Sequence, residues 1–61
     1  MAIKQTKQEW NALTGWVCEF ICDSEADIAN LPECSAGSMA IVATEGMPIY
    51  MMNASGQWVR V

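Results

Sequence analysis

The chain has 61 residues, enough for one small domain that buries only about 60% of its unfolded surface. With 52% hydrophobic and 16% charged residues, the composition excludes a disordered chain and indicates burial against other subunits. A net charge of −4, with only three basic residues, argues against nucleic-acid binding, which needs clustered Lys and Arg.

No stretch of the sequence approaches the ~20 apolar residues of a membrane-spanning helix, so we expect no membrane partner. The opening segment "MAIKQTKQEW" lacks the apolar core of a signal peptide. We therefore expect synthesis in the cytoplasm without secretion, where thiols stay reduced.

Residues 1–15 are expected to form an N-terminal arm or short helix. The T-x-x-E spacing that begins at Thr6 is typical of a helix capping box and predicts a helix over residues 7–14. An isolated helix of this length is marginal in water. Trp10 and Leu13 therefore need a surface to lie on, which is either the chain's own sheet or a neighbouring subunit.

Residues 16–61 are expected to form a small β-rich domain. The segment "WVCEFICD" at residues 16–23 is rich in aromatic and β-branched side chains and predicts a strand. Ser24 and the acidic residues after it predict one or two helical turns within residues 24–32, which end before a proline. Residues 33–38 are then a loop.

Three further strands are predicted at residues 39–44, 47–53 and 57–61. Residues 45–46 suit a two-residue hairpin loop, and residues 54–56 suit a three-residue loop with glycine in the left-handed conformation. The sequence therefore predicts a mainly β fold, with a small antiparallel sheet of about four strands and one or two short helices.

The two loops set the register of the last three strands. A two-residue loop pairs Val42 with Ile49, and a three-residue loop pairs Met51 with Val59. One face of the predicted sheet then carries Ala40, Val42, Ile49, Met51, Val59 and Val61. The other carries Met39, Ile41, Tyr50, Met52, Trp58 and Arg60. Because neither face is polar, we expect one of them to stay exposed as an apolar patch, which usually marks an interaction site.

The sequence is poor in groups for catalysis. It contains no histidine, the commonest general base and metal ligand, and its four glycines are scattered singly rather than grouped in a phosphate-binding loop. Helix N-terminal stabilisation and solvation account for the carboxylates. We expect no enzyme activity, no catalytic residue, no cofactor and no bound metal.

The three cysteines leave several interpretations open. Cys18 and Cys22 lie four residues apart on one predicted strand, a separation of roughly 13 Å, which is too long for a disulfide or a shared metal. Cys34 lies in the predicted loop and could approach either of them. Free buried thiols are the simplest interpretation. A disulfide that involves Cys34, and a redox or metal role, are the others.

Interface hot spots are enriched in Trp, Tyr and Arg. The predicted interface residues are Trp10, Leu13, Tyr50, Met52, Trp58 and Arg60. Trp58 has an alternative role as a core residue that holds the last strand in place. A platform on which bases or sugars stack is disfavoured because no basic residues lie between the aromatic ones.

Three segments of the chain read "FICDSEADIANLP", "AGSMAIVAT" and "IYMMNASGQWVRV". In these segments the chain resembles small structural proteins of bacteriophages and prophages, which carry a similar strand, an S/T-x-A-D-x-x-x-L-P turn and a Y-M-x-N-x-S-G-x-W-V hairpin. The resemblance covers residues 18–61 and brings no catalytic residues. It implies a head-associated virion role, such as decoration or cementing of a capsid or anchoring of a fibre.

We therefore expect a non-enzymatic virion structural protein that is made in the host cytoplasm and binds the major capsid protein or other virion subunits through apolar sheet faces. We also expect a homo-oligomer or a multi-copy assembly. The alternative is a small acidic binding module or inhibitor, which acts on a host protein by adding a strand to it.

Overall fold

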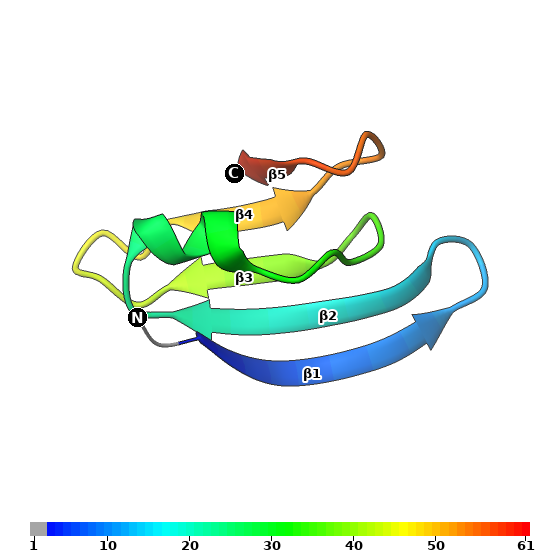
Figure 1. Ribbon diagram of the computed structural model, residues 1–61, viewed down its shortest axis with the longest axis horizontal. Coiled ribbons are helices and arrows are strands. Elements are labelled where there is room, and N and C mark those ends of the chain that lie inside the picture. The colour runs from blue at the N-terminus through cyan, green and yellow to red at the C-terminus, as the bar shows by residue number, and fades with distance from the viewer. Residues whose placement is uncertain (1–2) are drawn as a thin grey trace.

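Strands dominate the computed structural model, which describes residues 3–61 (Figure 1). In chain order the elements are β1 (Ile3–Asn11), β2 (Gly15–Cys22), the 3-10 helix η1 (Glu25–Asn30), β3 (Met39–Val42), β4 (Ile49–Met52) and β5 (Trp58–Arg60). The strands lie in the sheet in the order of the chain, so β1 and β5 form its two edges. The expectation of a mainly β fold is confirmed, with five strands in residues 3–61 rather than about four. Met1 and Ala2 of the predicted arm lie outside the described residues.

The sheet is mixed rather than wholly antiparallel, because β2 and β3 run parallel. A parallel pair needs a crossover connection, and residues 23–38 supply it. Figure 1 shows η1, part of this crossover, lying against one face of the sheet. The crossover side chains Ile28, Leu31 and Cys34 pack there on the buried Cys18 and Phe20. We call this the covered face.

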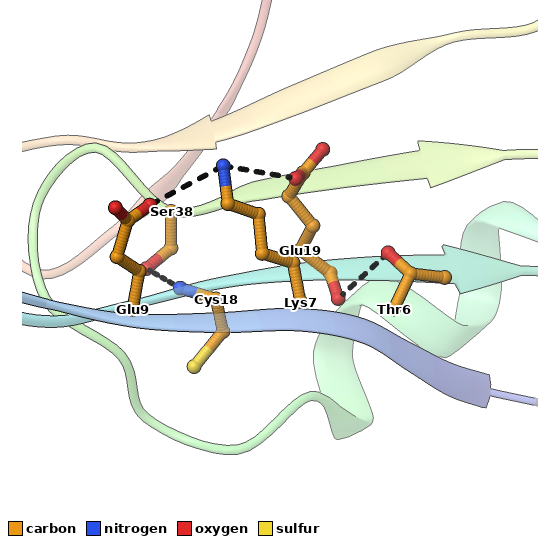
Figure 2. Close-up of polar contacts among 6 residues, drawn as sticks. All are labelled: Thr6, Lys7, Glu9, Cys18, Glu19 and Ser38. Atoms are coloured by element: carbon orange, nitrogen blue, oxygen red, sulfur yellow. Dashed lines mark hydrogen bonds and ion pairs between the residues drawn. The ribbon is translucent and has the colours of Figure 1, made fainter.

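The predicted helix over residues 7–14 is wrong, because this segment belongs to β1 and the turn after it. The hydroxyl of Thr6, expected to cap a helix, donates instead to the carbonyl oxygen of Glu19 on β2 at 3.3 Å (Figure 2). Trp10 meets Trp16 edge to face across the hairpin, with ring centroids 5.4 Å apart. Cross-strand contacts of this kind stabilise a hairpin, whereas so short a helix has little stability of its own.

The predicted register of β3 on β4 is wrong by one residue. Ile41, rather than Val42, pairs with Ile49. The connecting loop is longer than two residues, since the N–H of Val42 donates to the carbonyl oxygen of Pro48 at 2.9 Å and Met47 adopts a left-handed φ of 46°. A slip of one residue moves every side chain of a strand to the opposite face of the sheet. The side chains of β3 are therefore distributed between the faces in the reverse of the predicted sense.

The register of β4 on β5 is confirmed. Met51 pairs with Val59, and Gly56 has the expected left-handed φ of 79° in the loop between the strands. The N–H of Val61 donates to the carbonyl oxygen of Ile49 at 2.8 Å, so the last residue continues the ladder. The turn residues in the sequence were sufficient to predict this register, because the length and type of the turn determine how the two strands pair.

The core lies on the covered face, where the side chains of three adjacent strands meet the crossover. Its buried apolar members are Cys18, Phe20, Cys22, Ala40, Val42 and Met52. Ser38, which is fully buried, links the crossover to β2 by hydrogen bonds. Its Oγ accepts the N–H of Cys18 at 3.1 Å (Figure 2) and donates to the carbonyl oxygen of Ser35 at 2.8 Å.

Candidate protein-binding surfaces

Three of the predicted interface residues lie on the covered face and pack within the chain. Met52 is only 6% exposed. Trp58 meets Phe20 edge to face with ring centroids 6.3 Å apart, and Tyr50 is partly buried against the same cluster. This is the arrangement that the alternative role of Trp58, as a core residue, requires.

Tyr50 also ties β4 to η1. Its hydroxyl donates to Oε2 of Glu25 at 2.5 Å. This hydrogen bond, with desolvation and the negative charge of Glu25, raises the pKa of Tyr50, and the charge of Arg60 opposes the rise. Arg60 is exposed and pairs with Tyr50 on the neighbouring strand.

The opposite face of the sheet is aliphatic and accessible, and we call it the open face. Strand pairing aligns its side chains in two rows, which are Ile21, Ile41 and Ile49 in one and Met39, Met51 and Val59 in the other. Four of these side chains are more than a third exposed, namely Ile21 at 42%, Ile49 at 37%, Met51 at 39% and Val59 at 47%. Apolar side chains thus form an almost continuous surface across β2 to β5.

Charged side chains border the open face on the side of β1. Lys7 Nζ lies 3.3 Å from Oε2 of Glu9 and 3.9 Å from Oε2 of Glu19, as Figure 2 shows. Exposed ion pairs of this kind add little to stability. Their effect is to place a polar margin beside the aliphatic rows, which is the usual arrangement of an apolar interface core with a polar rim.

A second apolar surface lies at the tip of the β1–β2 hairpin, and we call it the tip patch. It consists of Trp10, Leu13 and Trp16, which are 61%, 92% and 51% exposed. The turn is held by the N–H of Leu13, which donates to Oδ1 of Asn11 at 2.8 Å. The structure thus brings two predicted interface residues, Trp10 and Leu13, to the hairpin tip, while Tyr50, Met52 and Trp58 lie on the covered face.

The three thiols are free, and Cys18 and Cys22 share the covered face as their strand pattern predicts. Burial, and then a hydrogen bond with Cys18, raise the pKa of Cys34 to about 11. Burial, and then the charges of Asp27 and Asp23, raise the pKa of Cys22. Thiols with raised pKa values are poor nucleophiles, because the thiolate is the reactive form.

Two further findings concern residues 3–61. No group of three or more His, Cys, Asp or Glu side chains is placed there to hold a metal ion. No helix in this range is long and apolar enough to cross a membrane.

Comparisons of the chain with protein-family models, with curated proteins and with solved structures find no match. The function of the chain is therefore inferred from its own surfaces.

The sequence predicted an apolar face that stays exposed, but the residues predicted to form that face were partly wrong. Ala40 and Val42 were assigned to the same face as Ile49, whereas the structure puts Met39 and Ile41 there. Ile21 and the other side chains of β2 were not included at all. Their place follows from the parallel pairing of β2 with β3, for which the sequence carries no local signal.

Proposed function

We propose that this protein is a non-enzymatic structural subunit of a bacteriophage virion, present in many copies and attached to the capsid surface. Two observations support the proposal. The first is the resemblance of residues 18–61 to small phage structural proteins. The second, which carries most weight, is the open face.

The open face has the composition of a binding surface for another protein. Together its two aliphatic rows span four strands, and the row that begins at Met39 meets the ionic margin of Lys7, Glu9 and Glu19 at Glu19. Contiguous exposed apolar side chains with a polar border are typical of protein–protein contacts. The partner that we propose is an apolar region on the outer surface of the major capsid protein.

The chain supplies contact area rather than reactive groups. It has no histidine, and the raised pKa values of Cys22 and Cys34 keep these thiols protonated near neutral pH. Aliphatic side chains and thiols of low reactivity suit a structural subunit that stays in place once it is bound.

The first test is the copy number of the chain in particles. Phage particles that come from the genome encoding the chain are purified on a density gradient, and the chain is quantified by mass spectrometry against the major capsid protein. We expect a fixed ratio with many copies per particle. Absence of the chain from particles, or fewer than one copy per particle, would refute the proposal.

The second test asks whether the open face makes the contact. Met51→Lys and Val59→Lys each place a charge in the second aliphatic row, and both positions are already exposed, so the fold should persist. We expect both variants to keep β-type circular dichroism and to lose incorporation into particles. Glu45→Lys, which changes the charge in an exposed loop, is the matched control and should incorporate fully. Full occupancy by Met51→Lys would show that the open face is not the binding surface.

The alternative function, a small acidic inhibitor that adds a strand to a host protein, has one observation in its favour. The nine-residue strand β1 forms an edge of the sheet, and edge strands can pair with another chain. The copy number separates the two functions, because an inhibitor would not be built into particles at a fixed ratio.

A further inference from the structure

The edge strand β1 has a sequence pattern that complements itself. At nine residues it is longer than the typical strand of about 5–6 residues, and β2 pairs with one side of it only. A long unpaired edge is a template for another strand. All of its side chains after Ile3 are exposed, on both faces of the sheet.

The pairing of β1 with β2 assigns each side chain of β1 to a face. Side chains on the covered face are Ile3, Gln5, Gln8 and Trp10, which oppose Cys22, Phe20, Cys18 and Trp16. Side chains on the open face are Lys4, Lys7 and Glu9, which oppose Ile21, Glu19 and Val17. Thr6 is the extra residue of a β-bulge between Gln5 and Lys7.

We propose that two copies of the chain pair antiparallel through β1, about a two-fold axis that passes between Thr6 and Lys7. On the open face, Lys4 of each copy then opposes Glu9 of the other, which joins opposite charges twice. On the covered face, Ile3 opposes Trp10 and Gln5 opposes Gln8, which joins apolar to apolar and amide to amide. Cross-strand pairs of these kinds each stabilise a sheet.

The bulge selects this register. A bulge interrupts the alternation of side chains between the two faces of its strand. From Ile3 to Trp10, paired side chains of the two copies therefore lie on the same face of the combined sheet only when the two bulges lie opposite each other. A shift by two residues toward the N-terminus would instead oppose Lys4 to Lys7, which places like charges together. Bulges and charges normally protect an edge from pairing. On β1 both features become complementary when the partner is a second copy.

The occupant is therefore a second copy rather than an unrelated strand. The side chains of β1 in one copy complement those of β1 in the other in both charge and polarity. An arbitrary peptide would not provide this match. The result is a continuous ten-stranded sheet, twice the five strands of one chain. This pairing does not depend on the capsid role, because it uses an edge of the sheet and leaves the aliphatic rows of the open face accessible.

Charge reversal tests the register. Lys4→Glu and Glu9→Lys each replace two attractive pairs of the dimer by two repulsive ones, and both side chains are exposed, so the monomer should fold normally. Sedimentation equilibrium should show a dimer for the wild type and a dissociation constant raised about tenfold or more for each single variant. The double variant Lys4→Glu/Glu9→Lys restores opposite charges and should restore the dimer. Glu45→Lys is the matched control and should dimerise as the wild type does.

Cross-linking tests the contact itself. A carbodiimide joins a lysine amine to a carboxylate that it touches, with loss of water. Within one chain, Lys4 and Glu9 are five positions apart on a strand, roughly 16 Å, so only a second copy can bring them together. In a mixture of ¹⁵N-labelled and unlabelled protein we expect Lys4–Glu9 cross-links of mixed isotopic mass. The Lys7–Glu9 pair, 3.3 Å apart in one chain, provides an internal positive control.

Three results would overturn the proposal. The first is a wild-type monomer at several hundred micromolar, which would also be the result if β1 paired only with another protein. The second is a dimer whose dissociation constant is the same in the wild type and in Lys4→Glu. The third is a Lys4–Glu9 cross-link confined to single-isotope species.

Discussion

At the residue scale, Ser38 shows how one hydroxyl joins segments that no local pattern links. It is fully buried, and its Oγ serves both the N–H of Cys18 and the carbonyl oxygen of Ser35. Ser38→Ala would remove the acceptor of the buried Cys18 N–H, whereas the carbonyl oxygen of Ser35 would keep the N–H of Ser38 at 3.2 Å. We expect the free energy of unfolding to fall by about 1–3 kcal/mol, as measured by urea denaturation. Ser55→Ala, in an exposed loop, should change it by less than about 0.5 kcal/mol. Equal effects of the two substitutions would contradict the role of Ser38.

The raised pKa of Cys34 predicts that the folded chain loses stability at alkaline pH. Its pKa is about 11 in the folded chain, against an ordinary thiol value of 9.0, because burial and the hydrogen bond with Cys18 favour the protonated form. A raised folded pKa gives stability that is complete below about pH 9 and is lost as the pH rises through about 11. We expect the free energy of unfolding to fall over this range. The fall should be smaller in Cys34→Ser, which has no titrating thiol, and identical curves for the two proteins would contradict the prediction.

At the scale of elements, the first and the last antiparallel hairpin differ in how far their sequences determine them. The β4–β5 loop was predicted correctly, since Gly56 supplies the left-handed conformation and Oδ1 of Asn53 accepts the N–H groups of Ser55 and Gln57 at 2.9 and 3.0 Å. The first hairpin was missed, because the segment that begins at Thr6 also satisfies the pattern of a helix start. Pairing with β2 decides between the two structures, and this pairing is a tertiary interaction.

Gly15, at the start of β2, gives a test of that first hairpin. Its φ is +103°, and a Cβ at this position would lie 2.8 Å from Oγ of Ser35, whose N–H donates to the carbonyl oxygen of Trp16. Gly15→Ala combines backbone strain with a close contact, so we expect it to cost about 1–3 kcal/mol of unfolding free energy. Gly46→Ala is the matched control, because no atom lies within 4 Å of the added Cβ, and it should cost less than about 1 kcal/mol. A Gly15→Ala protein as stable as Gly46→Ala would contradict the turn geometry.

At the scale of the whole molecule, the sequence predicts where the strands lie along the chain better than which strands pair with each other in the sheet. Strand composition and turn residues identified β2 to β5, and alternation placed Cys18 and Phe20 on one face. The composition of the open face escaped prediction for two reasons. The parallel pairing of β2 with β3 leaves no turn signature, and the loop that contains Met47 is longer than its Glu-Gly signal indicates.

Trp58 links the last strand to the rest of the fold. Its ring, on the edge strand β5, packs edge to face on the buried Phe20 of β2, three strands away in the sheet order. Trp58→Ala should cost about 3–5 kcal/mol, which is comparable to the whole stability of a small domain. We expect partial or complete unfolding by circular dichroism at 25 °C. Trp10→Ala, which removes a ring that is 61% exposed, should leave the spectrum of a folded β protein. A well-folded Trp58→Ala protein would contradict the core role of this ring.

The β1-paired dimer and the open face together predict bivalent binding to a capsid. Pairing that matches covered face with covered face requires a two-fold axis perpendicular to the sheet, so both open faces of the dimer point in the same direction. When one face binds a capsid, the other is held at high effective concentration near the next site, and the overall affinity exceeds that of a single face.

Particles that lack the chain are titrated with purified protein, and occupancy is measured by mass spectrometry. We expect Lys4→Glu to need at least about tenfold more protein for half occupancy than the wild type, and Lys4→Glu/Glu9→Lys, which restores the dimer, to need less protein than Lys4→Glu. Met51→Lys should not bind at any concentration in the same range. If Lys4→Glu and the wild type reach half occupancy together while sedimentation shows that only the wild type is a dimer, the dimer exists but contributes nothing to capsid binding.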